Sequence, residues 1–343
     1  MTVKLGKFLG TNYQVNISEM ADNQSVLLLG RSGSGKTVTL WKIEENIAQS
    51  GASVLVLNYA KTHNMRPKEG VIWLDVKKEG YPIPLFCKIL RPDGTKEDSQ
   101  DMEDAIIDVF LQTCALSIRQ KAALRRAVHR VVEQPEKWKN GFRAIGENLL
   151  KSDEEAALSV YDKFYAVFRG LPFSKEIMEV FIPGKVTVLD FSDFSLEVQI
   201  FLVELTLAIL WRYFRIWGQY AVVPLFLVLD EFQELQMRKH STLFQILREG
   251  RKFQLSVLLA TQTLNTFERW QCGVIMQAGT RLYFRPDVKN FEKILGEGSV
   301  NEDFWRKIKK FQRGDCVAVG RFRIGNLDAQ KPLLMTFREE KLR

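Results

Sequence analysis

Histidine and cysteine are scarce in this chain of 343 residues, which has three histidines and four cysteines. The cysteines lie far apart in the sequence and form no CxxC pair, and the histidines are too scattered to bind a metal ion together. Both absences argue against a structural zinc site and a disulfide framework. Reduced thiols in a cytoplasmic protein are therefore the simple expectation for Cys87, Cys114, Cys272 and Cys316.

Long apolar runs are also missing. The most apolar window, residues 200–217, is interrupted by Glu204, Arg212 and Arg215, which favours a buried helix over a membrane span. The N-terminal residues lack the apolar stretch of a signal peptide. Glycine and proline are too few for a long linker, and no internal repeat is visible. We expect a soluble protein with one large domain or two small ones and no transmembrane segment.

An acidic excess is absent too, because 49 Lys and Arg residues outnumber 41 Asp and Glu residues and give a formal net charge of +8. This balance suits a polyanionic partner such as nucleic acid, but many ordinary basic proteins share it. Charge alone therefore favours nucleic-acid binding but does not establish it.

Short apolar runs alternate with helical patterns in much of the chain. Residues 25–29 and 53–57 read as buried strands on either side of a helix at 36–49, which is the pattern of a parallel sheet. A helix at 197–217 follows the same alternation. We predict an α/β fold with a mainly parallel sheet, and the further strands are expected at 186–190, 222–229, 255–260, 281–284 and 316–319.

Strand-like runs vanish between residues 96 and 180. Apolar residues there recur at helical spacing in 101–116, 119–133 and 153–168, so this segment is predicted to be a helical insertion. The predicted division of the chain is an N-terminal part of the core at 1–95, the insertion at 96–180 and a C-terminal part of the core at 181–343.

A glycine-rich motif follows the first buried strand and opens the first helix. It matches GxxxxGK[ST], the P-loop or Walker A motif, whose backbone N–H groups surround a triphosphate at a helix N-terminus. Lys36 would reach the β- and γ-phosphates, and the Thr37 hydroxyl would ligate Mg²⁺. The motif predicts a RecA-like P-loop NTPase core that binds ATP and Mg²⁺ through Gly30, Arg31, Ser32, Gly33, Ser34, Gly35, Lys36 and Thr37.

Two carboxylates end the hydrophobic run at 225–229, as in a Walker B strand. Asp230 would hold Mg²⁺, and Glu231 would polarise the attacking water. A kinase of small molecules usually lacks the second acid, so the pair favours hydrolysis over transfer to another substrate. A solvated charge pair at a strand end is the plain alternative, and the P-loop weighs against it.

A third element, residues 248–262, begins REGRK and ends in Thr261-Gln262 after another apolar run. Gln262, at the end of a strand next to the Walker B strand, is placed to sense the γ-phosphate. This element resembles the GRK…TQ element of the FtsK–HerA superfamily of ring-forming DNA-pumping ATPases. LLLGRSGSGKT is similar to the P-loop of that family and LFLVLDEFQEL to its Walker B strand, and the resemblance covers most of the chain.

The resemblance implies further roles. Arg251 becomes an arginine-finger candidate and Arg281 a second one, because a planar guanidinium suits the charge that develops on a transferred phosphoryl group. A surface or interface ion pair is the alternative for each. The catalytic set implied for hydrolysis is therefore Glu231, Arg251, Gln262 and Arg281.

Two differences from the family stand out. Residues 57–61 read Leu-Asn-Tyr-Ala-Lys, where family members often carry an acidic residue, so we expect no contact of such an acid with Mg²⁺ or nucleotide here. The short N-terminus leaves no room for the β-barrel that precedes the motor of HerA or for the membrane anchor of FtsK, so we expect a nearly bare motor.

DNA contacts are the least determined part of the site. Three basic groups are candidates for binding phosphates, and a solvated helix face is at least as good an interpretation of each. The groups are Arg238 and Lys239; Arg119, Lys121, Arg125, Arg126 and Arg130; and Arg306, Lys307, Lys309, Lys310 and Arg313.

The resemblance implies an ATP-driven translocase of double-stranded DNA that works as a homo-hexameric ring and contacts the phosphate backbone without sequence preference. A conjugative or packaging pump with a membrane or capsid partner is the nearest alternative. A ring scaffold that assembles with ATP and activates a partner nuclease or other effector is a separate class, and a relaxase is the partner that conjugation would imply.

Overall fold

One sheet organises the molecule. The computed structural model describes residues 2–21, 23–61, 69–171, 180–221, 223–235, 237–286, 291 and 302–338. Within these residues a 13-stranded sheet has the order β12-β11-β2-β1-β13-β10-β9-β3-β8-β7-β4-β6-β5. The predicted α/β fold is confirmed.

The half of the sheet from β9 to β5 is parallel. Its central strands are mostly apolar and are buried along nearly their whole length, because helices cover both faces. The predicted strands are confirmed with small shifts at their ends, whereas β5 was not predicted. In spatial order the strands are β9 Thr280–Phe284, β3 Val26–Gly30, β8 Leu255–Thr261, β7 Leu225–Leu229, β4 Ser53–Asn58, β6 Val186–Asp190 and β5 Val71–Asp75.

The other half of the sheet is antiparallel and was largely missed by the sequence analysis. Only its strand at 316–319 was predicted. The remaining strands are only three to five residues long, so their local pattern is weak. Two of their pairings, β1 with β13 and β2 with β11, join opposite ends of the chain. The strands are β10 Asp315–Val319, β13 Leu333–Thr336, β1 Lys4–Phe8, β2 Gln14–Ile17, β11 Phe322–Ile324 and β12 Leu327–Ala329.

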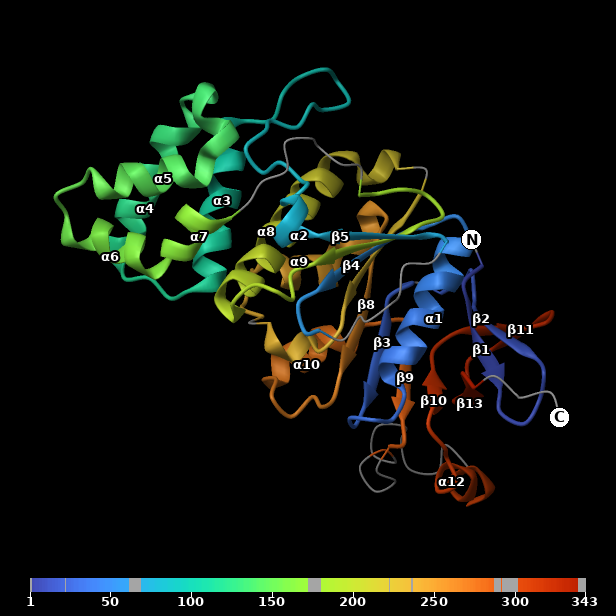
Figure 1. Cartoon of the computed structure of the whole chain (residues 1–343). Coiled ribbons are helices and arrows are strands. Elements are labelled where there is room, and N and C mark those ends of the chain that lie inside the picture. The colour runs from blue at the N-terminus through green and yellow to red at the C-terminus, as the bar shows by residue number, and fades with distance from the viewer. Residues whose placement is uncertain are drawn as a thin grey trace.

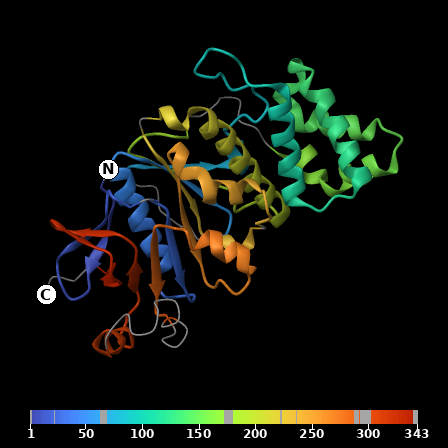
Figure 2. The same cartoon turned by 180° about the vertical axis from the view of Figure 1, so that it is seen from behind.

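Helices cover both faces of the sheet. Figure 1 shows α1 (Lys36–Gln49) in front of the sheet, and Figure 2 shows α9 (Thr242–Glu249) and α10 (Arg269–Ile275) in front when the molecule is seen from behind. The inner face of α1 packs against β3, β4 and β8, whose alternate residues share its apolar cluster. The long apolar α8 (Leu196–Trp217) belongs to the core on the opposite face.

A group of helices lies to one side of the sheet (Figure 1). T-shaped contacts of the Phe110 ring with the Phe164 ring, 4.9 Å between centroids, and with the Phe201 ring, 5.3 Å, tie this group to α8. The boundaries of a three-part division of the chain stay a prediction. The helices are α3 Ser99–Thr113, α4 Ile118–Val132, α5 Gly141–Leu150, α6 Glu155–Lys163 and α7 Tyr165–Gly170.

Several short helices complete the described structure. They are α2 Val76–Glu79, α12 Glu302–Ile308 and the 3₁₀ turns η1 Pro135–Asn140, η2 Gly218–Tyr220, η3 Phe232–Glu234 and η4 Gly250–Phe253. Residue 222, in a predicted strand, and His63 lie outside the described residues. No helix in the described part of the chain has the length and apolar character needed to cross a membrane.

Candidate functional site

The glycine-rich motif forms a tight loop between β3 and α1. Gly33 has φ +74° and Gly35 has φ +106°, a left-handed backbone that glycine adopts without steric cost. A side chain at Gly30 has no room, because its Cβ would lie 2.7 Å from Phe284 Cβ. The loop therefore needs its glycines for shape, as a backbone that surrounds phosphates requires.

Lys36 lies at the start of α1 with its ammonium group turned into the loop. Its Nζ donates hydrogen bonds to the carbonyl oxygens of Gly30, at 2.7 Å, and Arg31, at 3.3 Å. Burial lowers the pKa of Lys36, and the nearby carboxylates of Glu231 and Asp230 oppose this shift. The buried hydroxyl of Ser34 has no hydrogen-bond partner among the described residues. An unpaired buried hydroxyl and a cation inside a loop of N–H groups fit a phosphate ligand.

Thr37 and Asp230 meet across the site. The Thr37 hydroxyl donates a 3.2 Å hydrogen bond to Asp230 Oδ2, and the backbone N–H of Glu231 donates one of 2.9 Å to Asp230 Oδ1. The carboxylate of Asp230 is almost fully buried. A hydroxyl and a carboxylate oxygen side by side are the hard oxygen ligands that Mg²⁺ prefers, so these two residues fit the metal.

Glu231 is the second residue after β7 and has a left-handed backbone, with φ +51°. Such a conformation costs roughly 1–2 kcal/mol for a residue other than glycine, and it turns the side chain away from the strand direction. Two amides donate to its carboxylate: Gln262 Nε2 lies 3.1 Å from Oε1, and Gln233 Nε2 lies 2.5 Å from Oε2. The Thr261 hydroxyl in turn donates to Gln233 Oε1 at 2.6 Å.

Strand order brings these groups to one edge. Strand β8 lies between β3 and β7, with Thr261 opposite Leu29 and Leu259 opposite Leu229. Because carboxyl ends of parallel strands meet at the same edge, the P-loop, Gln262 and the Asp230–Glu231 pair are neighbours there. The structure thus brings together the residues that the sequence analysis assigned to Walker A, Walker B and the sensor.

Two residues of the site were missed by the sequence analysis. Gln233 had one available signal, its place two residues after Glu231 in the motif LDEFQEL. Tyr59, at the end of β4, has a buried hydroxyl without a partner among the described residues. Burial, and then the charges of Asp230, Glu231 and Glu234, raise the pKa of Tyr59 far above its ordinary value, so it stays a neutral phenol beside the carboxylates. Asn58, in the segment 57–61 that lacks an acid, donates a hydrogen bond of 3.0 Å to Asp190 Oδ1.

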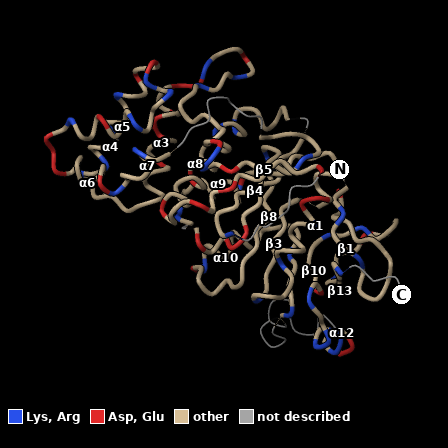
Figure 3. Tube along the Cα trace, in the orientation of Figure 1, with Lys and Arg blue, Asp and Glu red and all other residues tan. Residues whose placement is uncertain are grey.

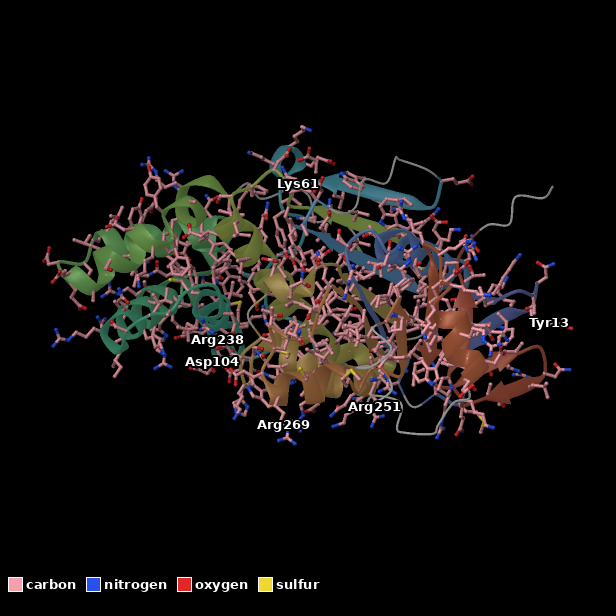
Figure 4. All side chains as sticks on the ribbon, turned by 90° about the horizontal axis from the view of Figure 1, so that it is seen from below. Tyr13, Lys61, Asp104, Arg238, Arg251 and Arg269 are labelled. Atoms are coloured by element: carbon pink, nitrogen blue, oxygen red, sulfur yellow. The ribbon has the colours of Figure 1, made fainter. Side chains whose placement is uncertain are left out.

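The two arginine candidates lie away from their own P-loop. Arg251 is exposed in η4, before the first residue of β8, whereas Gln262 follows the last one. Figure 4 shows Arg251 at the rim of the molecule, away from Lys61. Arg248, Arg251 and Arg321 line a cavity of 360 Å³. Arg281 lies opposite Leu27 in the sheet, before the carboxyl edge, and its buried Nε has no partner among the described residues.

The basic DNA candidates differ in their surroundings. Arg238 Nη1 donates a 2.6 Å hydrogen bond to the carbonyl oxygen of Leu111, near the end of α3. Lys239 is exposed. On α4, Arg119, Arg125 and Arg130 are exposed, and Arg126 pairs with Glu154. Figure 3 shows basic residues clustered at α12. There Lys307 and Arg306 both pair with Asp303, at 2.9 Å and 4.0 Å, and the other exposed members are Lys309, Lys310 and Arg313.

Comparisons with known proteins agree with this architecture. The family model described as "Helicase HerA, central domain" matches residues 3–209, which is more than half of the chain. The chain belongs to this family. The predicted resemblance to the FtsK–HerA superfamily is therefore confirmed. No curated protein matches the sequence.

Solved structures with the same fold cover nearly the whole chain of this HerA-family protein. VirB4 of Thermoanaerobacter pseudethanolicus is 16% identical with a TM-score of 0.71, over 98% of this chain and 96% of VirB4. The unbound bacterial conjugative coupling protein TrwBΔN70 is 12% identical with a TM-score of 0.63, over 97% and 98%. The plasmid coupling protein TrwB in complex with ADP and Mg²⁺ is 14% identical with a TM-score of 0.63, over 94% and 88%. At these identities the likeness shows the fold alone.

Proposed function

We propose that this HerA-family protein is an ATP-driven translocase of double-stranded DNA that works as a homo-hexameric ring. The observation that carries the proposal is the meeting of three elements at one sheet edge: the P-loop after β3, Gln262 after β8, and Asp230 with Glu231 after β7. Phosphoryl transfer to water needs little more than positioning and charge stabilisation, and these residues supply both.

Each side chain has a distinct task at this edge. The loop amides and Lys36 hold the triphosphate, and Thr37 with Asp230 holds Mg²⁺, which neutralises charge on the phosphate oxygens when it is bound. Glu231 accepts a hydrogen bond from the attacking water and orients it. Gln262 already contacts Glu231 at 3.1 Å, so a turn of its side chain toward a γ-phosphate would couple nucleotide state to the acid.

The position of Arg251 supports a ring with shared sites. Seven residues of β8 separate the η4 end from the Gln262 end, a distance of about 20 Å at the rise of a β-strand, so Arg251 does not reach the nucleotide of its own subunit. An arginine at the opposite edge is available to a neighbouring subunit, where it would stabilise the transition state. Arg281 is the second choice for this role.

Binding to DNA is supported by family membership and by charge. The chain carries +8, and exposed cations lie on α4 and beyond α12. A motor that moves along a duplex must hold phosphates and not bases, so its binding is independent of sequence and weakens steeply with salt.

A conjugative DNA pump is the second candidate, and one observation favours it. The structural likeness to VirB4 and to the conjugative coupling protein TrwB extends over nearly the full length of each chain. A cytoplasmic ring that acts with a membrane partner or a relaxase belongs to this version of the proposal. A scaffold for a nuclease differs from both, because its ATP turnover would not respond to DNA.

The test is the rate of Mg²⁺-dependent ATP hydrolysis by the purified chain with and without long duplex DNA. We expect stimulation by duplexes of unrelated sequence that fades as salt rises to several hundred millimolar. Lys36→Ala, which loses the phosphate-binding ammonium group, is the inactive control. ATP turnover that ignores DNA at every salt concentration would contradict the translocase and favour the scaffold.

A further inference from the structure

We propose that Gln233 is the positioning residue of Glu231, held in the correct orientation by the hydroxyl of Thr261. The inference rests on the proposed function, because Glu231 is taken as the acid that orients the attacking water. The chain of contacts runs from Thr261 Oγ1 to Gln233 Oε1, 2.6 Å, and from Gln233 Nε2 to Glu231 Oε2, 2.5 Å.

The chemistry of the partners fixes which way the amide points. An ionised carboxylate only accepts hydrogen bonds, so the Gln233 amide must turn its NH₂ group to Glu231. Its carbonyl oxygen then faces Thr261, which must donate its proton. Thr261 is fully buried in β8, paired with Leu29 of the P-loop strand, so the donor is fixed by the sheet. The Thr263 carbonyl oxygen lies 3.0 Å from the same hydroxyl, so Thr261 alone would tolerate either orientation of the amide. A flipped amide would turn its oxygen to the Glu231 carboxylate, and the contact with Glu231 therefore fixes the orientation.

Glu231 needs such a holder because of where it lies. It lies two residues beyond the end of β7 in a left-handed conformation and is only half buried, so the strand does not fix its side chain. Its backbone N–H is bound by Asp230 Oδ1, which leaves the carboxylate free to rotate about its own side-chain bonds. A misplacement of about 1 Å at a catalytic group costs on the order of a hundredfold in rate.

The two oxygens of Glu231 have different partners, and this division allows a change of state. Gln262 holds Oε1 from β8, the strand between the P-loop strand and β7. When Gln262 turns to a γ-phosphate, Oε1 becomes free to accept the attacking water. Oε2 stays with Gln233, so the carboxylate keeps its place at the moment of reaction. Gln233 is the fixed contact and Gln262 the exchangeable one.

Steady-state hydrolysis by single variants tests the first link. Gln233→Met keeps the length of the side chain and removes both polar ends. We expect its kcat to fall roughly tenfold to a hundredfold while KM and nucleotide affinity stay within about twofold. Gln271→Met is the matched control, because the Gln271 amide donates a 2.6 Å hydrogen bond to the Met237 carbonyl and is not part of the contacts that hold Glu231. A Gln233→Met enzyme with wild-type kcat, or with a raised kcat, would overturn the inference.

Thr261 variants test the second link. Thr261→Val is nearly isosteric and loses the hydroxyl, so its kcat should fall by a smaller factor, and Thr261→Ser should retain the wild-type rate. In the double variant, Thr261→Val should add nothing to the kcat loss of Gln233→Met, because the hydroxyl reaches Glu231 through that amide and its other contact, the Thr263 carbonyl at 3.0 Å, does not lead to Glu231. Rate losses that multiply in the double variant would overturn the proposed relay, which is the chain of contacts from Thr261 through Gln233 to Glu231. If Gln233→Met fails to fold, the kcat values of Thr261→Val and Thr261→Ser test the inference by themselves.

A last measurement separates the inference from the proposed function. A wild-type protein without Mg²⁺-dependent ATP hydrolysis would contradict the proposed function. Urea unfolding of the nucleotide-free protein tests the relay in the absence of ATP hydrolysis. The effects of Gln233→Met and Thr261→Val on the free energy of unfolding should be non-additive. Additive effects would overturn the relay even in a protein that hydrolyses ATP.

Discussion

Gly35 of the P-loop and Gly314 of the C-terminal segment are in direct contact. A Cβ at Gly35 would lie 2.8 Å from the Gly314 nitrogen, and that nitrogen donates a 2.9 Å hydrogen bond to the Ser34 carbonyl oxygen. The Gly314 carbonyl accepts a 3.0 Å bond from the Phe337 nitrogen. A segment close to the C-terminus therefore braces the phosphate loop near the start of the chain.

The first prediction concerns this brace. Gly314 has φ +89°, and a Cβ there would meet only an ordinary contact with Arg338 Cγ at 3.4 Å, so Gly314→Ala is strained by its backbone alone. We expect a loss of roughly 1–2 kcal/mol in the free energy of unfolding, with nucleotide affinity several-fold weaker because the Ser34 contact is disturbed.

Gly325 offers the matched control for that measurement. It has φ +59°, and nothing lies within 4 Å of its Cβ position in the turn between β11 and β12. Gly325→Ala should also lower the free energy of unfolding while nucleotide affinity stays unchanged. Equal nucleotide affinity in the two variants, measured by titration with a fluorescent ATP analogue, would contradict the proposed role of the brace.

The second prediction concerns sharing of sites between subunits. Arg251→Ala subunits, which still bind nucleotide, are mixed with Lys36→Ala subunits, and we expect ATP hydrolysis to reappear in mixed rings. Restoration follows if one subunit supplies the arginine and its neighbour supplies the P-loop. Inactivity at every mixing ratio, in rings whose mass confirms that they are mixed, would remove Arg251 as a finger acting in trans. The same experiment with Arg281→Ala then tests the second choice.

The third prediction is a pH dependence of stability. Burial of Glu204 raises its pKa from the ordinary 4.5 to about 8, against an opposing effect of Arg238. Between these two values the unfolded chain loses the proton that the folded protein keeps, so stability falls as pH rises. The loss from Glu204 at pH 7 is about 3 kcal/mol, at 1.36 kcal/mol for each unit of pKa shift. Urea unfolding at pH 5 and pH 8 measures it.

Two variants on the same helix check the assignment to Glu204. Glu204→Gln stays neutral at every pH, so the difference in stability between pH 5 and pH 8 should shrink. Glu197→Gln, at an exposed position of α8, should leave the difference as it is in the wild type. An unchanged pH dependence in Glu204→Gln would show that another group is responsible.

Sequence alone was informative where the relevant contacts are local. Strand β3, the P-loop and α1 follow one another within 24 residues of chain, and the apolar run, the glycines and Lys36 each have a distinct local cause. The same holds for β7 with Asp230 and Glu231. These elements were predictable because each depends on neighbours in the sequence.

Contacts between distant segments were not predictable. Strand β1 pairs with β13, and Gly314 meets Gly35, across almost the whole length of the chain. The relay from Thr261 through Gln233 requires β8 to lie beside β7 in one register, which no spacing reveals.

The most direct test of the central claim is ATP binding and hydrolysis by Glu231→Gln. The account holds that the edge formed by the P-loop, Gln262 and Glu231 hydrolyses ATP with Glu231 as the acid that orients water. Glu231→Gln keeps the size of the side chain and loses its negative charge, so the variant should bind Mg²⁺-ATP as the wild type does. Its single-turnover rate should fall by roughly two to four orders of magnitude. Hydrolysis at the wild-type rate by Glu231→Gln would contradict the account.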